Sequence, residues 1–201
     1  LPMVAATELS DSPRAPLMAG SQEKADAAFL LAALLPDTYL LINNGQECRE
    51  RQPMNLGLLN DEAGRFVLPK EDPMYGKLAF FDRVSFHWTQ GQEAFDWIRQ
   101  VTALRRACSS LRSNPHAFAA GLLRKPGPLV RLAYQNGGQA LYACFSFAAQ
   151  PQTVSLEEEF GPEAAALFPG RPLLSRGVCP SGAHFVFSPG GCLVFGRQIP
   201  L

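Results

Sequence analysis

The chain has 201 residues, 47% of them hydrophobic, which is enough apolar material for one or two domains with a buried core. Its 18 Lys and Arg residues balance 18 Asp and Glu residues, and this neutrality argues against binding to nucleic acid or to an anionic membrane. Five cysteines without a Cys-x-x-Cys pair favour buried thiols in a reducing compartment, which predicts a cytoplasmic protein. No apolar run is long enough to span a membrane, and no motif predicts a metal site or a cofactor.

The first elements of the chain are a short strand and a polar turn. Residues 3–7 are apolar and predict the strand, and Pro13 prevents it from continuing. The turn between them contains Glu8 and Asp11. Carboxylates at the C-terminal end of a strand suggest a functional site, but Asp11 or Ser12 could equally shape an Asx-type turn. Both interpretations are open at this point.

A helix and a second strand follow. Residues 21–35 have apolar positions at helical spacing, a capping-box-like start and a proline at their end. Residues 39–42 are fully apolar and predict a buried strand. Strand-helix-strand connections are almost always right-handed, so the two strands should lie parallel with their C-terminal ends together. Asp11 and Glu47 are then expected on the same rim, where α/β proteins bind their ligands.

A long segment, residues 48–90, has no clear periodicity. It is long for a connection within a compact domain, so we expect it to be functional or ordered by packing. Its many hydrogen-bonding side chains suit a sugar ligand. It also carries four aromatic residues, which stack on sugar faces in some proteins but more often form a satellite core, namely Phe80, Phe81, Phe86 and Trp88.

The spacing of apolar residues changes in the second half of the chain. Residues 92–111 have the strongest helical pattern of the chain, after a capping-box spacing that begins at Thr89. Beyond about residue 114 the period becomes 2, which predicts a domain boundary and an antiparallel β-sandwich over residues 115–201. The turns expected to join its strands are Asn136-Gly137-Gly138 and Gly190-Gly191.

Three segments resemble one known family in their order and spacing. They are Glu8-Leu9-Ser10-Asp11-Ser12-Pro13-Arg14, the run Thr38-Tyr39-Leu40-Leu41-Ile42-Asn43-Asn44-Gly45-Gln46-Glu47, and Leu104-Arg105-Arg106. They resemble, in turn, the ends of the seventh and eighth barrel strands and the last barrel helix of the α-amylase family of glycoside hydrolases and transglycosidases. The similarity covers nearly the whole chain and points to the C-terminal part of such an enzyme.

This resemblance implies an α/β fold followed by an all-β domain. Residues 1–114 would be the last two strand-helix units of a (β/α)8 TIM barrel, followed by the sandwich. The chain begins at Leu1 without an initiator methionine, so we expect an upstream barrel segment of the same protein as its partner. The implied substrate is an α-glucan or maltodextrin, and Asp11 would be the carboxylate that stabilises the transition state. The implied substrate-binding residues are Glu8, Ser10, Arg14, Asn43 and Glu47. The nucleophile and the acid/base would lie on earlier strands.

The sequence departs from the family pattern at one point. Leu9 and Ser10 stand where the family usually has Asn and His, and leucine makes no hydrogen bond. This change leaves open a maltosyltransferase or phosphate-accepting relative, or weakened activity. A second hypothesis is a non-catalytic carbohydrate-binding or scaffold relative that uses residues 48–90 as an interaction surface. Hydrolysis and glycosyl transfer are equally compatible with the sequence.

Overall fold

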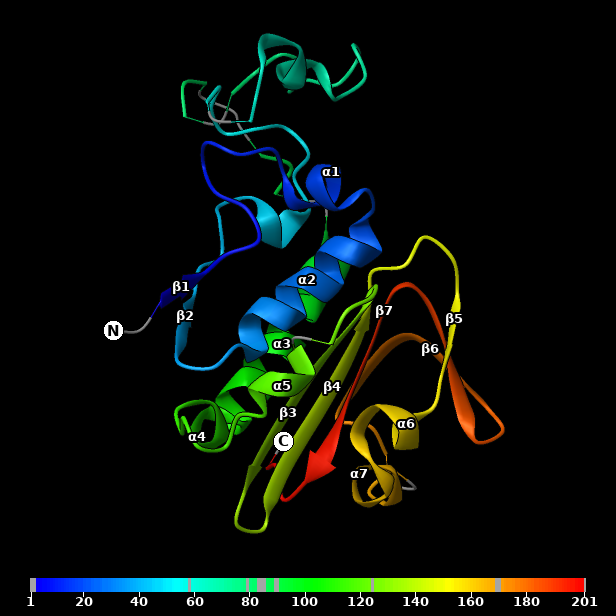
Figure 1. Ribbon diagram of the computed structural model, residues 1–201. Coiled ribbons are helices and arrows are strands. Elements are labelled where there is room, and N and C mark those ends of the chain that lie inside the picture. Colours follow the sequence, from blue (N-terminus) through cyan, green and yellow to red (C-terminus); the bar gives the residue numbers. More distant parts are fainter. Residues whose placement is uncertain are drawn as a thin grey trace.

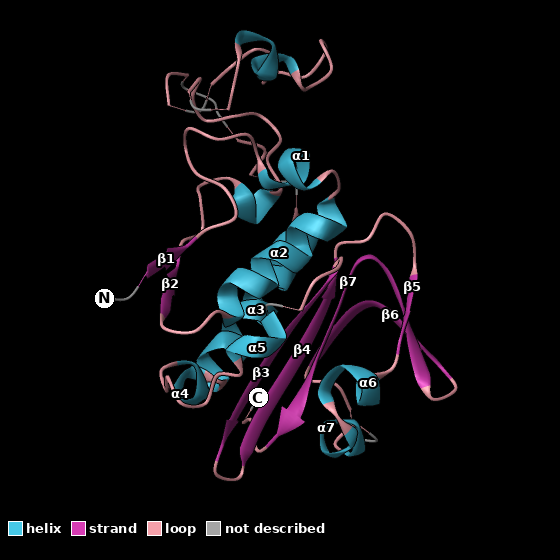
Figure 2. Cartoon of the chain, in the orientation of Figure 1, coloured by secondary structure: helices cyan, strands magenta, loops and turns pink. Residues whose placement is uncertain are grey.

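The computed structural model describes residues 3–57, 59–78, 80–82, 86–88, 91–123, 125–168 and 171–200. Figures 1 and 2 show a helical part around α2, a larger antiparallel sheet beside it, and a long irregular loop at the top. In chain order the elements are β1 (Met3–Ala5), α1 (Ala15–Ala19), α2 (Gln22–Leu34), β2 (Thr38–Leu40), two 3₁₀ helices (Gln46–Cys48 and Glu62–Phe66), α3 (Gln92–Ala107), α4 (Ser109–Arg112), α5 (Ala120–Leu123), β3 (Leu129–Asn136), β4 (Gln139–Ser146), β5 (Gln152–Val154), α6 (Leu156–Phe160), α7 (Pro162–Ala166), β6 (Leu174–Ser181) and β7 (His184–Arg197).

β1 and β2 form the predicted parallel pair, connected through the predicted helix α2 and through the short helix α1, which the sequence did not predict. Met3 pairs with Thr38 and Ala5 with Leu40, so both strands run toward the same end of the pair. The pairing ends where Leu41 N–H donates a hydrogen bond to the Ala5 carbonyl at 2.9 Å. Beyond this point each strand passes into a loop. The two loops therefore share one rim, as the sequence predicts.

α2 lies at the centre of the molecule in Figure 1. It begins at the predicted cap, where the Ser21 hydroxyl accepts a hydrogen bond from Lys24 N–H at 3.2 Å. Its Phe29, Leu30 and Leu34 side chains are buried, because the helix contacts α3 on one side and the C-terminal sheet on another. Burying each such side chain stabilises the fold by about 1.5–3 kcal/mol. α2 therefore holds the two halves of the chain together.

The long segment between β2 and α3 is ordered by contacts with the rim. The close approach of Gly91 to Cys48 is one of these contacts. Gly91 has φ +93°, and a Cβ there would lie 2.7 Å from the Cys48 Cα, so only glycine fits. Gly91 also precedes the first residue of α3. The predicted capping box begins at Thr89, which lies outside the described residues, as does Gln90.

The C-terminal half is antiparallel, as predicted, but its described strands form one sheet rather than two. The order is β3-β4-β7-β5, with β6 pairing on β7. The predicted hairpin is confirmed, since β3 and β4 pair from Leu129↔Ser146 to Asn136↔Gln139 around Gly137, which has φ +57°. The second sheet of a sandwich is not found in the part of the chain that the structure describes.

The prediction of a hairpin turn at Gly190-Gly191 is wrong. Both glycines lie inside the single long strand β7. Gly190 has φ +77°, and a Cβ added there would lie 2.4 Å from the Glu23 carbonyl carbon. The glycine is therefore needed because the backbone of β7 passes directly against the first turn of α2. A close backbone approach, and not a chain reversal, explains the pair.

Two apolar cores lie on the sheet, and the larger one joins both predicted domains. It contains Leu34 and Val101 from the helices together with Leu141 and Val194 from the sheet. The buried Tyr134 hydroxyl donates a hydrogen bond to the Leu34 carbonyl at 2.6 Å across this core. The smaller core packs the sheet against α6 and α7. A boundary near residue 114 stays a prediction, and residues on both sides of it share one core.

Candidate functional site

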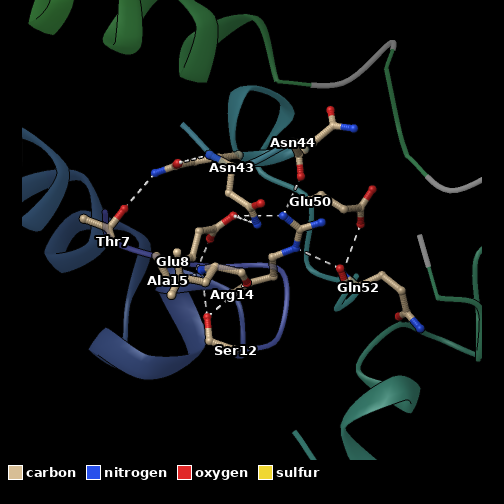
Figure 3. A network of polar contacts seen from close by, with 12 residues as sticks. Thr7, Glu8, Ser12, Arg14, Ala15, Asn43, Asn44, Glu50 and Gln52 are labelled. Carbon is tan, nitrogen blue, oxygen red and sulfur yellow. Dashed lines mark hydrogen bonds and ion pairs between the residues drawn. The ribbon is translucent and has the colours of Figure 1, made fainter. Parts of the chain in front are cut away.

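The predicted site residues lie in the two loops at the shared rim. Glu8, Ser10, Asp11 and Arg14 follow β1, and Asn43 and Glu47 follow β2. Hydrogen bonds between the two loops confirm that they are neighbours: the Asn43 amide donates to Glu8 Oε1 at 3.4 Å, and the Gln46 amide donates to Thr7 Oγ1 at 2.9 Å. Figure 3 shows this network.

Glu8 and Arg14 form a buried ion pair. Arg14 Nη1 donates to Glu8 Oε1 at 2.8 Å, and both side chains are only 2% exposed. The other carboxylate oxygen, Glu8 Oε2, accepts the Ala15 backbone N–H at 2.7 Å. Both oxygens of Glu8 are therefore used by protein groups. The substrate contacts predicted for Glu8 and Arg14 stay predictions, and this burial favours a role in holding the rim together.

Arg14 also fixes the two loops that lie above it. Its Nη1 donates to the Asn44 carbonyl at 2.8 Å, and its Nε donates to the Gln52 carbonyl at 2.9 Å. The guanidinium lies 5.8 Å from the centre of the Phe86 ring, close enough for a cation–π contact. Figure 3 shows the guanidinium between Glu8 and the Asn44 and Gln52 carbonyls. One buried cation thus positions the loop after β2 and the start of the long loop.

Asp11 does not shape the turn in which it lies. The Ser12 hydroxyl does so, since it accepts the Leu9 N–H at 2.9 Å and donates to the Leu9 carbonyl at 3.1 Å. Asp11 is partly exposed, and its Oδ1 accepts a hydrogen bond from the Asn55 side chain at 2.9 Å. Ser10 beside it is partly exposed. Of the two interpretations open from the sequence, the turn-forming role therefore belongs to Ser12 and not to Asp11.

Glu47 is partly buried near the same rim. Its Oε2 is shielded from solvent and has no hydrogen-bond partner among the described residues. The nearby arginines are engaged elsewhere: Arg49 pairs with Asp26 and Glu93, and Arg51 donates to the Val67 carbonyl. A buried carboxylate oxygen needs a donor. Glu47 is therefore able to accept a hydrogen bond from a water or from a ligand hydroxyl, and its role in binding stays a prediction.

The structure reveals a histidine bridge that the sequence did not predict. His87 Nδ1 lies 2.8 Å from Glu50 Oε2, and His87 Nε2 lies 3.0 Å from Asp72 Oδ1. Burial lowers the pKa of His87, but the hydrogen bonds to Glu50 and Asp72 outweigh it, so the net pKa is raised. The pKa of Asp72 is lowered by the Met74 N–H and by His87. His87, near the end of the long loop, thus joins that end to Glu50 at the start of the loop and to Asp72 in its middle.

A second polar cluster joins the C-terminal sheet to the helices. Arg49 and Arg176 lie between two carboxylates, with Arg49 Nη2 3.0 Å and Arg176 Nη1 2.5 Å from Asp26 Oδ2, and both arginines also contact Glu93. Arg176 lies 5.0 Å from the centre of the Trp97 ring. Burial raises the pKa of Asp26, against the lowering effect of its partners. Each of the four charged side chains forms an ion pair with another member of the cluster, so we assign the cluster a structural role.

The aromatic residues of the long loop are more exposed than predicted. Phe86 is buried and stacks edge-on with Trp88 at a ring distance of 5.2 Å. Phe80, Phe81 and Trp88 are exposed. The predicted satellite core therefore holds for Phe86 alone among the four. The three exposed rings leave flat apolar faces on the long loop, of the kind that stack on sugars.

No metal-binding group of three or more His, Cys, Asp or Glu side chains is found in the part of the chain that the structure describes. Within the same residues, no helix is both long and apolar enough to cross a membrane. Neither the protein-family models nor the sequences of curated proteins give a match to this chain.

Solved structures with a similar fold do exist. The chain matches Bacillus licheniformis trehalose-6-phosphate hydrolase with a TM-score of 0.62 and 14% identity, covering 96% of this chain and 42% of that one. It matches Eubacterium rectale Amy13B with a TM-score of 0.59 and 14% identity, covering 98% and 39%. It matches the debranching enzyme of Nostoc punctiforme with a TM-score of 0.55 and 17% identity, covering 96% and 35%.

These comparisons concern the fold. The matched proteins are α-amylase family enzymes, and the chain spans less than half the length of each. The resemblance found in the sequence is therefore confirmed at the level of the fold. The low identities carry no statement about activity.

Proposed function

We propose that this chain is the C-terminal part of an α-glucan-active glycoside hydrolase or transglycosylase of the α-amylase family. In this proposal β1 and β2 are the last two strands of a (β/α)8 barrel. Support comes from their exposure: Met3 is 70%, Val4 65% and Tyr39 66% exposed. Two short parallel strands with exposed apolar side chains lack the covering that parallel sheets require. The upstream barrel strands would supply it.

The observation that carries the proposed function is the place of Asp11. Its partly exposed carboxylate lies at the rim after β1, and the hydroxyl of Ser12 rather than Asp11 forms the local turn. We assign Asp11 the contact with sugar hydroxyls that strengthens as positive charge develops at the anomeric carbon. Such a contact lowers the energy of the transition state more than that of the bound substrate. Asn43 and Glu47 line the same rim and are proposed to bind the sugar.

A second candidate is a non-catalytic carbohydrate-binding relative. The observation that favours it is the exposed Leu9, which occupies the rim where the family has a hydrogen-bonding residue. Ser10 likewise replaces the histidine of the family. Such a rim keeps apolar and carboxylate surface for binding a sugar, but it has fewer side chains that can hydrogen-bond the sugar during the reaction.

The two candidates are separated by an Asp11→Asn variant of the complete protein, assayed on maltodextrin with and without inorganic phosphate or a second sugar as acceptor. We expect kcat to fall by about 10²-fold or more, on the scale of one lost transition-state contact, with an unchanged melting temperature. Asp96→Asn, on the surface of α3, is the matched control and should retain full activity. Full activity of Asp11→Asn would contradict the catalytic proposal, and sugar binding without turnover in the unchanged protein would favour the binding relative.

A further inference from the structure

We propose that Asn55, in the long loop, is a positioning residue that orients the carboxylate of Asp11. This inference rests on the function proposed above. The Asn55 Nδ2 lies 2.9 Å from Asp11 Oδ1. An ionised carboxylate only accepts hydrogen bonds, so the nitrogen of the amide, and not its oxygen, faces Asp11. The bond joins the loop after β1 to the long loop.

Asn55 is itself held in place. The Asn60 side chain donates to the Asn55 carbonyl at 3.0 Å, and the Asn60 backbone N–H donates to the Gly57 carbonyl at 2.8 Å. These bonds close a short turn around the residue. Gly57 lies beside Asp11, where an added Cβ would be 3.5 Å from the Asp11 Cβ. The turn therefore packs against the carboxylate from one side and presents the amide to it.

The start of the long loop is anchored independently of Asp11. Arg14 Nε donates to the Gln52 carbonyl at 2.9 Å, only three residues before Asn55. The Glu50 carboxylate accepts the Gln52 N–H at 3.1 Å and contacts His87. A donor carried by an anchored backbone holds its partner more tightly than a donor on a free loop, because less conformational entropy is lost in the contact.

The two carboxylate oxygens of Asp11 have different surroundings. Oδ1 receives the amide of Asn55, and Oδ2 accepts no hydrogen bond from the residues that the structure describes. The bond fixes the rotation of the carboxylate, so that Oδ2 is left for a sugar hydroxyl. A positioned group contributes through orientation, and small displacements of such groups reduce turnover strongly. Ser10, which stands in place of the family histidine, makes no such bond to Asp11 within the described chain.

The test uses steady-state kinetics of the complete protein on maltodextrin. Asn55→Ala should lower kcat by about 10-fold, with KM changed by less than about 3-fold and the melting temperature retained, since one hydrogen bond to a charged group is lost. Asn55→Asp keeps the shape but replaces the donor by a second carboxylate, so it should lower kcat at least as much. The control is Glu71→Ala, an exposed position of the same loop, which should behave as the unchanged protein.

Combination with Asp11→Asn decides whether Asn55 acts through Asp11. If it does, adding Asn55→Ala to Asp11→Asn lowers kcat no further. An equal loss in both backgrounds overturns the inference, and so does a normal kcat in Asn55→Ala when Asp11→Asn is inactive. A normal kcat in Asn55→Asp, with a loss in Asn55→Ala, would show that shape alone matters and also overturns it. Full activity of Asp11→Asn contradicts the proposed function, and this inference fails with it.

Discussion

Replacing Arg14 by Met should destabilise the rim severely. The guanidinium makes three hydrogen bonds, to Glu8 at 2.8 Å, to the Asn44 carbonyl at 2.8 Å and to the Gln52 carbonyl at 2.9 Å. Methionine fills a similar volume but donates none of them. The substitution therefore leaves a buried carboxylate without its cation and two backbone carbonyls without their donors.

The size of the loss follows from the burial of the pair. Glu8 and Arg14 are each 2% exposed, so water cannot replace the lost partner at the carboxylate. Removing one member of a buried ion pair costs about 3–5 kcal/mol, mainly because the other charge stays buried and uncompensated. This is a large share of the roughly 5–15 kcal/mol by which a domain is stable. Removing both members, in Glu8→Leu with Arg14→Met, should cost less than Arg14→Met alone.

The assay is urea unfolding of the complete protein, together with hydrogen exchange of a peptide that covers residues 3–17. The Ala15 amide reports directly, because it donates to Glu8 Oε2 at 2.7 Å. The control is Arg99→Met, since Arg99 pairs with Asp96 at the surface and is 79% exposed. That pair should contribute less than about 1 kcal/mol.

Two results would refute this reasoning. A loss below about 1 kcal/mol in Arg14→Met would mean that the pair is solvated as surface pairs are. A double variant that is less stable than Arg14→Met would mean that packing, and not the uncompensated charge, determines the cost.

The remaining predictions concern the His87 bridge and the close approach of β7 to α2 at Gly190. Because the pKa of His87 is raised above 6.5, the bridge to Glu50 and Asp72 stabilises fully below pH 6.5 and is lost as pH rises through the raised pKa. The difference in melting temperature between His87→Gln and the unchanged protein should therefore shrink as the pH rises from 6.5 through the raised pKa. A difference that stays constant with pH would contradict a stabilising role of the bridge. Gly190→Ala should cost about 2–4 kcal/mol in urea unfolding, from positive φ and the clash with α2, against about 1 kcal/mol for Gly182→Ala, where φ is +62° and the space is open. Equal losses would exclude the clash.

The sequence by itself determined the local elements and the rim. Ser21 marked the start of α2, Asn136 and Gly137 marked the hairpin, and the apolar strands on either side of α2 implied a parallel pair. These signals depend on residues close together in the chain, where capping, turn geometry and periodicity act. Asp11 was placed at the rim by the same reasoning, because the strand before it must end at Pro13.

Only the tertiary structure decided how the rim is held together. Asn55 donates to Asp11, and His87 joins Glu50 to Asp72, across distances in the chain that no periodic pattern encodes. The same limit explains why the hairpin turn predicted at Gly190-Gly191 is wrong. A glycine pair indicates either a chain reversal or a close backbone contact, and which of the two occurs depends on whether another element packs against the pair. Here α2 packs against Gly190, so the glycine pair serves a close contact. In the same way, which side chains from remote segments become partners depends on the tertiary packing that brings those segments together.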